Sequence, residues 1–217
     1  WVMDADGANA KQLTTNRNSE GNASLSPDGT TVLFTASTNE QSDPYYNDKL
    51  FLVPAAGGPA RVLLPAVSYE VENASWSQDS KSIYFTANMG VHNEIMKVDV
   101  ATKQVTQLTR GDHNLGGWAF SEENGLHVFL RNTGPRASEV HVVAASGGEP
   151  KRITSVFDED LAKFKTARVE KITWKGQDGV MVEGLLWYPV DYTPGQKYPL
   201  IVATHGGPAS SDRFGFS

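Results

Sequence analysis

The chain has 217 residues, of which 39% are hydrophobic, enough to bury a core. Its formal net charge is −6 and it has no block of lysines or arginines, which argues against a nucleic acid or an anionic membrane surface as its main partner. The lack of cysteine excludes disulfides and thiolate metal sites, and no apolar run in the sequence is long enough to span a membrane.

The compartment stays open on these grounds. A chain without cysteine suits the cytoplasm as well as the periplasm or the outside of the cell. The start of the chain contains no charged and then apolar leader. Because Trp1 reads as the middle of a strand, we expect the native N-terminus to lie upstream, where a leader would be out of view.

In chain order, residues 1–154 repeat one pattern. Three segments join a serine, a polar turn and a strand of alternating apolar residues, at 23–37, 74–88 and 118–132. Between them lie hairpins, each with a strand, a turn of Asp, Ala, Gly or Thr, and a second short strand. The apolar residues that close these hairpins, at a spacing of 50, 45 and 45 positions, are Leu13, Leu63, Leu108 and Ile153.

A period near 45 with about four strands is typical of the blades of a β-propeller. Residues 1–154 are therefore expected to form about three blades and part of a fourth. The regular spacing disfavours the alternative, a β-sandwich with recurrent turns. Since a closed propeller has at least four blades, we expect further blades upstream of Trp1. The aromatic residues at repeat positions, expected in the blade cores, are Trp76, Phe85, Trp118 and Phe120.

The histidines of the repeat region lack the spacing of metal ligands. They are scattered over the expected blades, so we predict surface or packing roles for them. No metal and no cofactor are expected. These four residues are His92, His113, His127 and His141.

After Ile153 the pattern changes. Residues 155–168 are expected to form an interdomain linker, because Phe157–Lys171 mixes charges of both signs with apolar residues at a helical spacing over one or two turns. Residues 169–217 predict a second domain. It begins with a hairpin around a Gln-Asp-Gly turn, and the apolar run Tyr198–Ala203 then reads as a buried strand.

The end of the chain carries the most specific motif, His-Gly-Gly-Pro at residues 205–208. Blades with turns like Ser-Pro-Asp-Gly at 26–29, followed by Gly-Leu-Leu-Trp-Tyr-Pro at 184–189 and by this motif, resemble the serine peptidases of the prolyl oligopeptidase family. The motif is most similar to that of the acylaminoacyl-peptidase and bacterial dipeptidyl-peptidase branch. The resemblance covers essentially the whole chain. It implies a mostly β fold, a partial β-propeller followed by the first strands of an α/β-hydrolase domain.

The same resemblance implies a serine-type peptidase, an exopeptidase or oligopeptidase, whose propeller gates access for short peptide substrates. Acyl transfer builds negative charge on the former carbonyl oxygen, and fixed N–H donors aimed at that oxygen lower the barrier. The resemblance places one donor on the N–H of Gly207, with Gly206 shaping the loop, whereas Pro208 has no N–H. His205 is expected to orient the loop through hydrogen bonds, and not to be the base of the triad.

No nucleophile elbow of the form Gly-x-Ser-x-Gly occurs in the sequence. Ser146 precedes two glycines in a hairpin turn, and Ser210 and Ser211 do not lie in an elbow. We therefore expect the chain to be a fragment, inactive alone, whose Ser, Asp and His triad lies beyond Ser217. Its unpaired hydrolase strands would be exposed edges, which favours a homo-oligomer.

Two other functions stay open at this stage. A TolB-like propeller that binds a protein partner explains the blades but not the hairpin and motif after residue 168. An esterase of the same superfamily explains the motif but not the blades. For the peptidase itself, removal of acyl-amino acids, removal of dipeptides and cleavage after proline are all compatible with the sequence.

Overall fold

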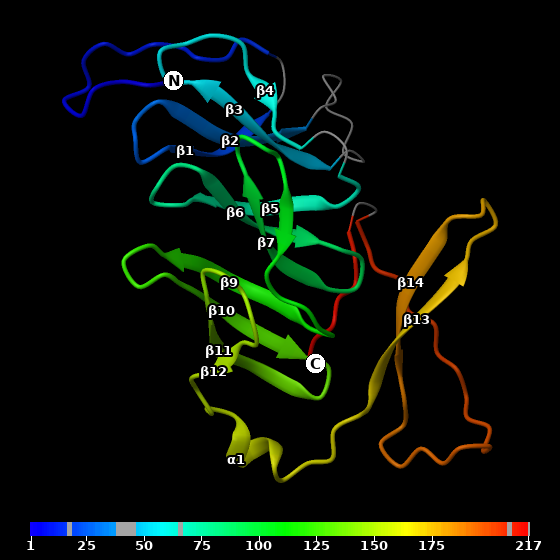
Figure 1. Cartoon of the computed structure of the whole chain (residues 1–217). Helices are drawn as coiled ribbons and strands as arrows, with labels where there is room; N and C mark the ends of the chain where they lie inside the picture. Colours follow the sequence, from blue (N-terminus) through cyan, green and yellow to red (C-terminus); the bar gives the residue numbers. More distant parts are fainter. Residues whose placement is uncertain (17–18, 38–46, 65–66, 208–209, 217) are drawn as a thin grey trace. The chain divides into compact units, whose positions relative to one another are not determined.

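The computed structural model describes all residues except 17–18, 38–46, 65–66, 208–209 and 217. The chain divides into two compact units, residues 1–87 with 95–108 and residues 88–94 with 109–217. Its described strands form three four-stranded sheets and one two-stranded sheet (Figure 1). Among the described residues, no helix has the length and apolar character needed to cross a membrane.

Each four-stranded sheet is an antiparallel meander whose strands lie in chain order, as in a propeller blade. The first sheet contains β1 (Glu20–Leu25), β2 (Thr31–Ser37), β3 (Asp48–Pro54) and β4 (Arg61–Val62). The second contains β5 (Glu70–Trp76), β6 (Ser82–Asn88), β7 (Asn93–Asp99) and β8 (Val105–Gln107). The third contains β9 (Asn114–Ser121), β10 (Leu126–Thr133), β11 (Arg136–Ala144) and β12 (Lys151–Arg152).

The expected part of a fourth blade is represented by the first residues of the chain. There, the backbones of Val2 and Lys11 pair through two hydrogen bonds, of 2.9 and 2.8 Å. This pairing closes the predicted hairpin, but it does not extend into a longer ladder within the described residues.

The serine of the repeated turn holds that turn together. Ser26 Oγ accepts a hydrogen bond from the N–H of Thr31 at 3.0 Å and donates one to Asp28 Oδ1 at 2.6 Å. Ser77 and Asp79 repeat the second contact at 2.6 Å. The bond from Ser26 is the main reason why the pKa of Asp28 is lowered. The shared serine pattern therefore encodes a specific turn geometry that starts the second strand of a blade.

The aromatic residues at repeat positions differ between the blades. Trp76 and Phe85 are buried, as predicted. Trp118 and Phe120 are only half-buried, so for them the prediction of a core position is wrong in degree. The reason is His127, which is fully buried and whose ring lies 6.0 Å from that of Trp118 and 4.8 Å from that of Phe120. A buried polar ring thus takes the inner position beside these two aromatic residues.

The buried ring of His127 predicts a pH-dependent stability. Loss of hydration holds the pKa of His127 at about 4, below the ordinary value of 6.5, so the neutral form is favoured in the folded state. Since the unfolded chain binds the proton more readily, this contribution to stability should be constant above pH 6.5 and fall as the pH drops from 6.5 toward 4. Thermal unfolding midpoints across this range measure the effect. A His127→Phe variant should lose this part of the pH dependence; an unchanged slope would contradict the assignment.

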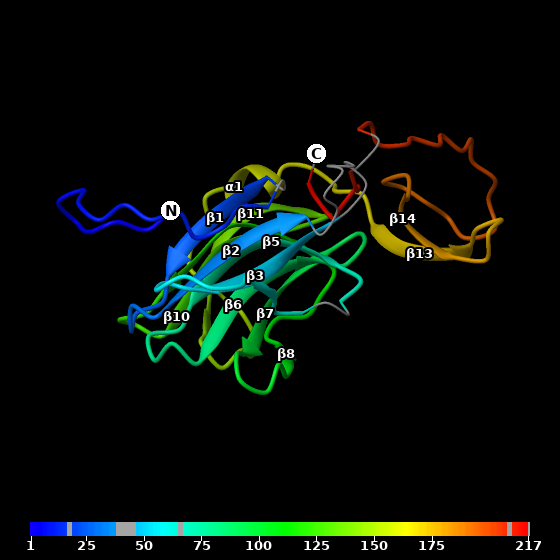
Figure 2. The ribbon, with the colours of Figure 1, turned by 90° about the horizontal axis from the view of Figure 1, so that it is seen from above.

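The region after the blades contains one helical turn and a hairpin. The turn predicted in the linker is confirmed as α1 (Asp158–Leu161), and Arg152 forms an ion pair with Asp158 at 2.6 Å just before it. Strands β13 (Val169–Lys175) and β14 (Met181–Trp187) pair along their whole length as an antiparallel ribbon (Figure 2). The hairpin predicted around the Gln-Asp-Gly turn is thereby confirmed.

The predicted buried strand over Tyr198–Ala203 is not formed. These residues have no strand pairing, and Leu200, Ile201 and Val202 are 75%, 90% and 77% exposed. The physical reason is that a strand requires hydrogen bonds to a neighbour, and no described strand runs beside this run. The run has the apolar composition of a strand, but none of the described residues pairs with it.

A tight contact joins the β10–β11 turn to the start of β13. A Cβ atom added at Gly134 would lie 1.8 Å from Val169 Cγ1, so the glycine is required by close packing. We expect Gly134→Ala to lower the free energy of unfolding by about 1–3 kcal/mol, as overpacking does. Val169→Ala in the same variant should restore part of it. The matched control is Gly116→Ala, since nothing lies within 4 Å of a Cβ atom added there. Thermal unfolding measures both variants, and an equal loss of stability in the two would contradict the contact.

Candidate functional site

The motif that carries the predicted chemistry lies in an exposed bend. His205, Gly206 and Gly207 are all exposed, and Pro208 lies outside the described residues. Gly207 has φ +144°, in the region that favours glycine. Among the described residues, none accepts a hydrogen bond from the Gly207 N–H. The bend therefore presents a backbone donor, which is what an oxyanion site requires.

The side chain of His205 is fixed by the bend itself. Its Nδ1 lies 3.1 Å from the carbonyl oxygen of Gly206, and because a carbonyl can only accept, Nδ1 carries the proton in this contact. Within the described part of the chain, neither a serine nor a carboxylate is hydrogen-bonded to this imidazole. This arrangement supports a role in orienting the loop.

The segment just after the motif is anchored by three contacts. Asn88 Nδ2 donates to Ser211 Oγ at 3.1 Å. The N–H of Phe214 donates to the carbonyl of Val91 at 2.9 Å, and the ring of Phe214 is 1% exposed. The N–H of Phe216 donates to the side chain of Asn132 at 2.7 Å. The chain is therefore held within a few residues of the exposed bend.

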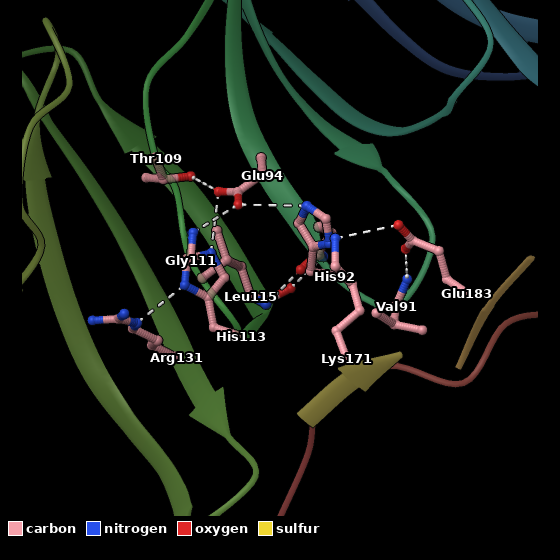
Figure 3. Close-up of polar contacts among 11 residues, drawn as sticks. Val91, His92, Glu94, Thr109, Gly111, His113, Leu115, Arg131, Lys171 and Glu183 are labelled. Atoms are coloured by element: carbon pink, nitrogen blue, oxygen red, sulfur yellow. Dashed lines mark hydrogen bonds and ion pairs between the residues drawn. The ribbon is translucent and has the colours of Figure 1, made fainter. Parts of the chain in front are cut away.

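Two of these anchors belong to the end of β6 and to the turn from β6 to β7, which also contacts β14. The N–H of Val91 donates to Glu183 Oε2 at 3.3 Å, and Lys171 Nζ lies 3.2 Å from Glu183 Oε1 (Figure 3). Gly90 has φ +92°, and a Cβ atom there would lie 2.2 Å from Glu183 Oε2. Glycine at position 90 thus lets the carboxylate approach the turn.

Next to this turn lies a buried polar cluster around Glu94, which is 1% exposed (Figure 3). The carboxylate accepts hydrogen bonds from Thr109 Oγ1 at 2.6 Å and from the N–H of Gly111 at 3.1 Å. His113 Nε2 lies 3.1 Å from Glu94 Oε2, and His92 Nε2 lies 3.9 Å from Oε1. The prediction that the histidines are scattered is therefore wrong for His92 and His113, which meet at one carboxylate.

The contacts of His113 define its protonation. The carboxylate of Glu94 accepts from Nε2, and Arg131 Nε donates to Nδ1 at 3.2 Å, so Nδ1 carries no proton. The imidazole thus bridges a carboxylate and a guanidinium. No group of three or more His, Asp or Glu side chains in the described ranges is arranged to hold a metal ion.

The Glu94 cluster repeats in the third sheet, which indicates a structural role. Glu139, one repeat later, accepts a hydrogen bond from the hydroxyl of Thr154, and the N–H of Phe157 donates to its carboxylate at 3.1 Å. In both sheets a glutamate of the third strand thus holds the residues that follow the fourth strand. We interpret Glu94 as part of the blade, and not as a catalytic group.

The remaining candidate serines lie as follows. Ser146 lies in the turn after β11, where Gly147 and Gly148 have φ +83° and +127°, as expected for a hairpin turn. Ser210 is exposed, and Ser211 is bound by Asn88. The predicted site residues therefore lie together in one bend, and no serine of the described residues joins them as a nucleophile.

Sequence reasoning missed the anchors of the segment after the motif, Asn88, Val91 and Asn132. They lie far from the motif in sequence, and Val91 acts only through its backbone. The pair of Gly90 with Asn88 in a short turn was the one local signal, because glycine is favoured where two segments approach closely.

Comparison with known proteins confirms the resemblance to peptidases of the prolyl oligopeptidase family. The chain is 26% identical over 189 residues to dipeptidyl-peptidase 5 of Porphyromonas gingivalis, a match that covers 86% of this chain and 27% of that protein. The chain thus spans about a quarter of the length of this curated relative. No family model matches the chain.

Two solved structures show which fold the chain shares. An acylaminoacyl peptidase in complex with Z-Gly-Gly-Phe-chloromethyl ketone matches 98% of this chain with 31% of its own, with a TM-score of 0.75 and 23% identity. TolB from Acinetobacter baumannii matches 71% of this chain with 37% of its own, with a TM-score of 0.52 and 22% identity. The predicted partial β-propeller in a mostly β chain is confirmed, whereas an α/β-hydrolase domain after it stays a prediction.

Proposed function

We propose that the chain is part of a serine peptidase that hydrolyses short peptides. In this proposal residues 1–154 form propeller blades that gate the active site, residues 155–168 are the linker, and residues 169–217 begin the hydrolase domain. The relative from Porphyromonas gingivalis, a dipeptidyl-peptidase, favours dipeptides as the released unit. The nucleophilic serine, the acid and the base are supplied by residues outside this sequence.

The observation that carries the proposal is the bend at Gly207, which follows the blades and the hairpin in the order found in such peptidases. Its N–H has no acceptor among the described residues, and its φ of +144° suits glycine. During acyl transfer this N–H would donate to the oxygen that becomes negative, together with the N–H of the residue after the nucleophile. Gly206 shapes the bend, and His205 holds it through the Gly206 carbonyl.

The alternative of a binding propeller explains less of the chain. The match to TolB covers 71% of the chain, whereas the match to the acylaminoacyl peptidase covers 98% of it. The difference in coverage favours the reading that includes the hairpin β13–β14 and the motif. A binding propeller has no need of an exposed donor at the end of such a segment.

The test is made on the full-length protein. It should react covalently with a fluorophosphonate probe for active serines and should release p-nitroaniline from dipeptidyl substrates; residues 1–217 alone should do neither. N-acyl-aminoacyl anilides, run in parallel, distinguish the released unit. A full-length protein that neither reacts with the probe nor cleaves any of these substrates would overturn the proposal.

A further inference from the structure

We propose that residues 88–92, which are the last residue of β6 and the turn from β6 to β7, position the oxyanion loop of the peptidase. The inference rests on the proposed function, because it assigns a role to this turn in the same reaction. Its residues touch neither the motif nor a reacting atom, so they are positioning residues. We call this segment the positioning turn.

The positioning turn is hydrogen-bonded to the chain just beyond the motif at two points. The Asn88 side chain donates to Ser211 Oγ at 3.1 Å, and the carbonyl of Val91 accepts from the N–H of Phe214 at 2.9 Å. The burial of Phe214 adds a hydrophobic anchor to the second hydrogen bond. Two bonds at separate points of the same short segment fix both its place and its direction.

These two contacts lie close enough along the chain to the Gly207 N–H to affect its position. Ser211 lies only four positions after Gly207, so the two Cα atoms cannot be more than about 14 Å apart. On the other side of the motif, residues 198–205 have no strand pairing within the described part of the chain. The nearest described anchors of the donor therefore lie downstream, on the positioning turn.

The positioning turn is itself held firmly. The N–H of Met89 donates to the carbonyl of His92 at 2.9 Å, which closes the turn. Next to it, the side chain of Asn93 exchanges two hydrogen bonds with the backbone of Leu115, of 2.6 and 2.8 Å. The N–H of Val91 is bound by Glu183. Val91 thus links β14 through its N–H with the segment after the motif through its carbonyl.

A fixed donor matters most in the transition state. An oxyanion donor contributes only if it already points to the place where the charge develops, because reorganisation during the reaction costs free energy. A loosened positioning turn should therefore lower kcat, whereas KM, which reflects binding of the ground state, should change little. This pattern separates positioning from a general loss of structure.

The experiment uses the full-length enzyme with Asn88→Ala and Ser211→Ala. We expect each to lower kcat about tenfold with KM within about twofold, as for the loss of one hydrogen bond that acts on the transition state. The inhibition constant of a peptide aldehyde, whose tetrahedral adduct places an oxyanion in the hole, should rise by the same factor. Ser211→Thr keeps the hydroxyl and should restore activity; the neighbouring Ser210→Ala should resemble the wild type.

The double variant Asn88→Ala/Ser211→Ala provides a second test. It remains informative even if one of the two single variants folds poorly. If Asn88 and Ser211 act through their shared bond, the double variant should be no slower than either single variant. Unchanged kcat and unchanged aldehyde inhibition in both single variants would overturn the inference. So would a rise of KM by the same factor as the inhibition constant, because the variants would then have lost binding of the ground state as much as binding of the oxyanion. In those cases the wild type still reacts with the serine probe, whereas failure of the proposed function leaves the wild type itself unreactive.

Discussion

Replacing Gly207 by proline should lower kcat of the full-length enzyme by about 10²–10³-fold, the usual effect of removing one oxyanion donor. Proline has no N–H, and its ring fixes φ at a negative value, far from the +144° of Gly207. The effect should fall on kcat, with a proportional loss of affinity for a peptide aldehyde. Steady-state kinetics with a dipeptidyl anilide measure it.

Gly195→Ala is the matched control for this prediction. Gly195 also has a positive φ, of +85°, lies in the same part of the chain, and has nothing within 4 Å of an added Cβ. The Gly195→Ala substitution should therefore lower stability somewhat through backbone strain but leave kcat near the wild-type value. A Gly207→Pro enzyme as active as the Gly195→Ala enzyme would exclude Gly207 as an oxyanion donor.

The second large effect concerns stability. Glu94→Ala should lower the free energy of unfolding by about 3–5 kcal/mol, because it removes the acceptor that the buried donors of Thr109 and His113 share with the part-buried N–H of Gly111. In a domain of about this size such a loss lowers the unfolding midpoint by roughly 10 °C. Scanning calorimetry of the full-length protein detects it.

Glu94→Gln should lower the free energy of unfolding by less, about 1–3 kcal/mol. One carbonyl acceptor remains in this variant, but the new amide group is a donor that faces other donors. The exposed Glu123→Ala serves as a control for removal of a charge and should stay within about 0.5 kcal/mol of the wild type. If Glu94→Ala were as harmless as Glu123→Ala, the cluster would not stabilise the blade. If it abolished activity without changing stability, our assignment of a structural role would be wrong.

Most of the fold could be predicted because propeller blades are built from local contacts. Each hairpin and each serine turn is encoded within one short stretch of sequence, as the bonds of Ser26 to Asp28 and Thr31 illustrate. The spacing of the closing residues then indicates the repeat. The motif at residues 205–208 can be recognised for the same reason, since its composition is itself the signal.

What could not be predicted depends on contacts that neither composition nor spacing shows. The run Tyr198–Ala203 has the composition of a strand, but composition does not show whether a partner strand lies beside it. Trp118 has the repeat position of a core residue, and the burial of His127 beside it cannot be inferred from spacing. The link from Asn88 to Ser211 joins residues 123 positions apart, and neither residue type marks it.

The proposed function is tested most simply by reading the coding DNA beyond the codon for Ser217. If the chain contributes the oxyanion loop of a serine peptidase, the reading frame should continue with a Gly-x-Ser-x-Gly elbow, then an aspartate and then a histidine, in that order. A stop codon directly after Ser217, or a continuation without an elbow, would contradict the peptidase assignment and leave a propeller that binds a protein partner.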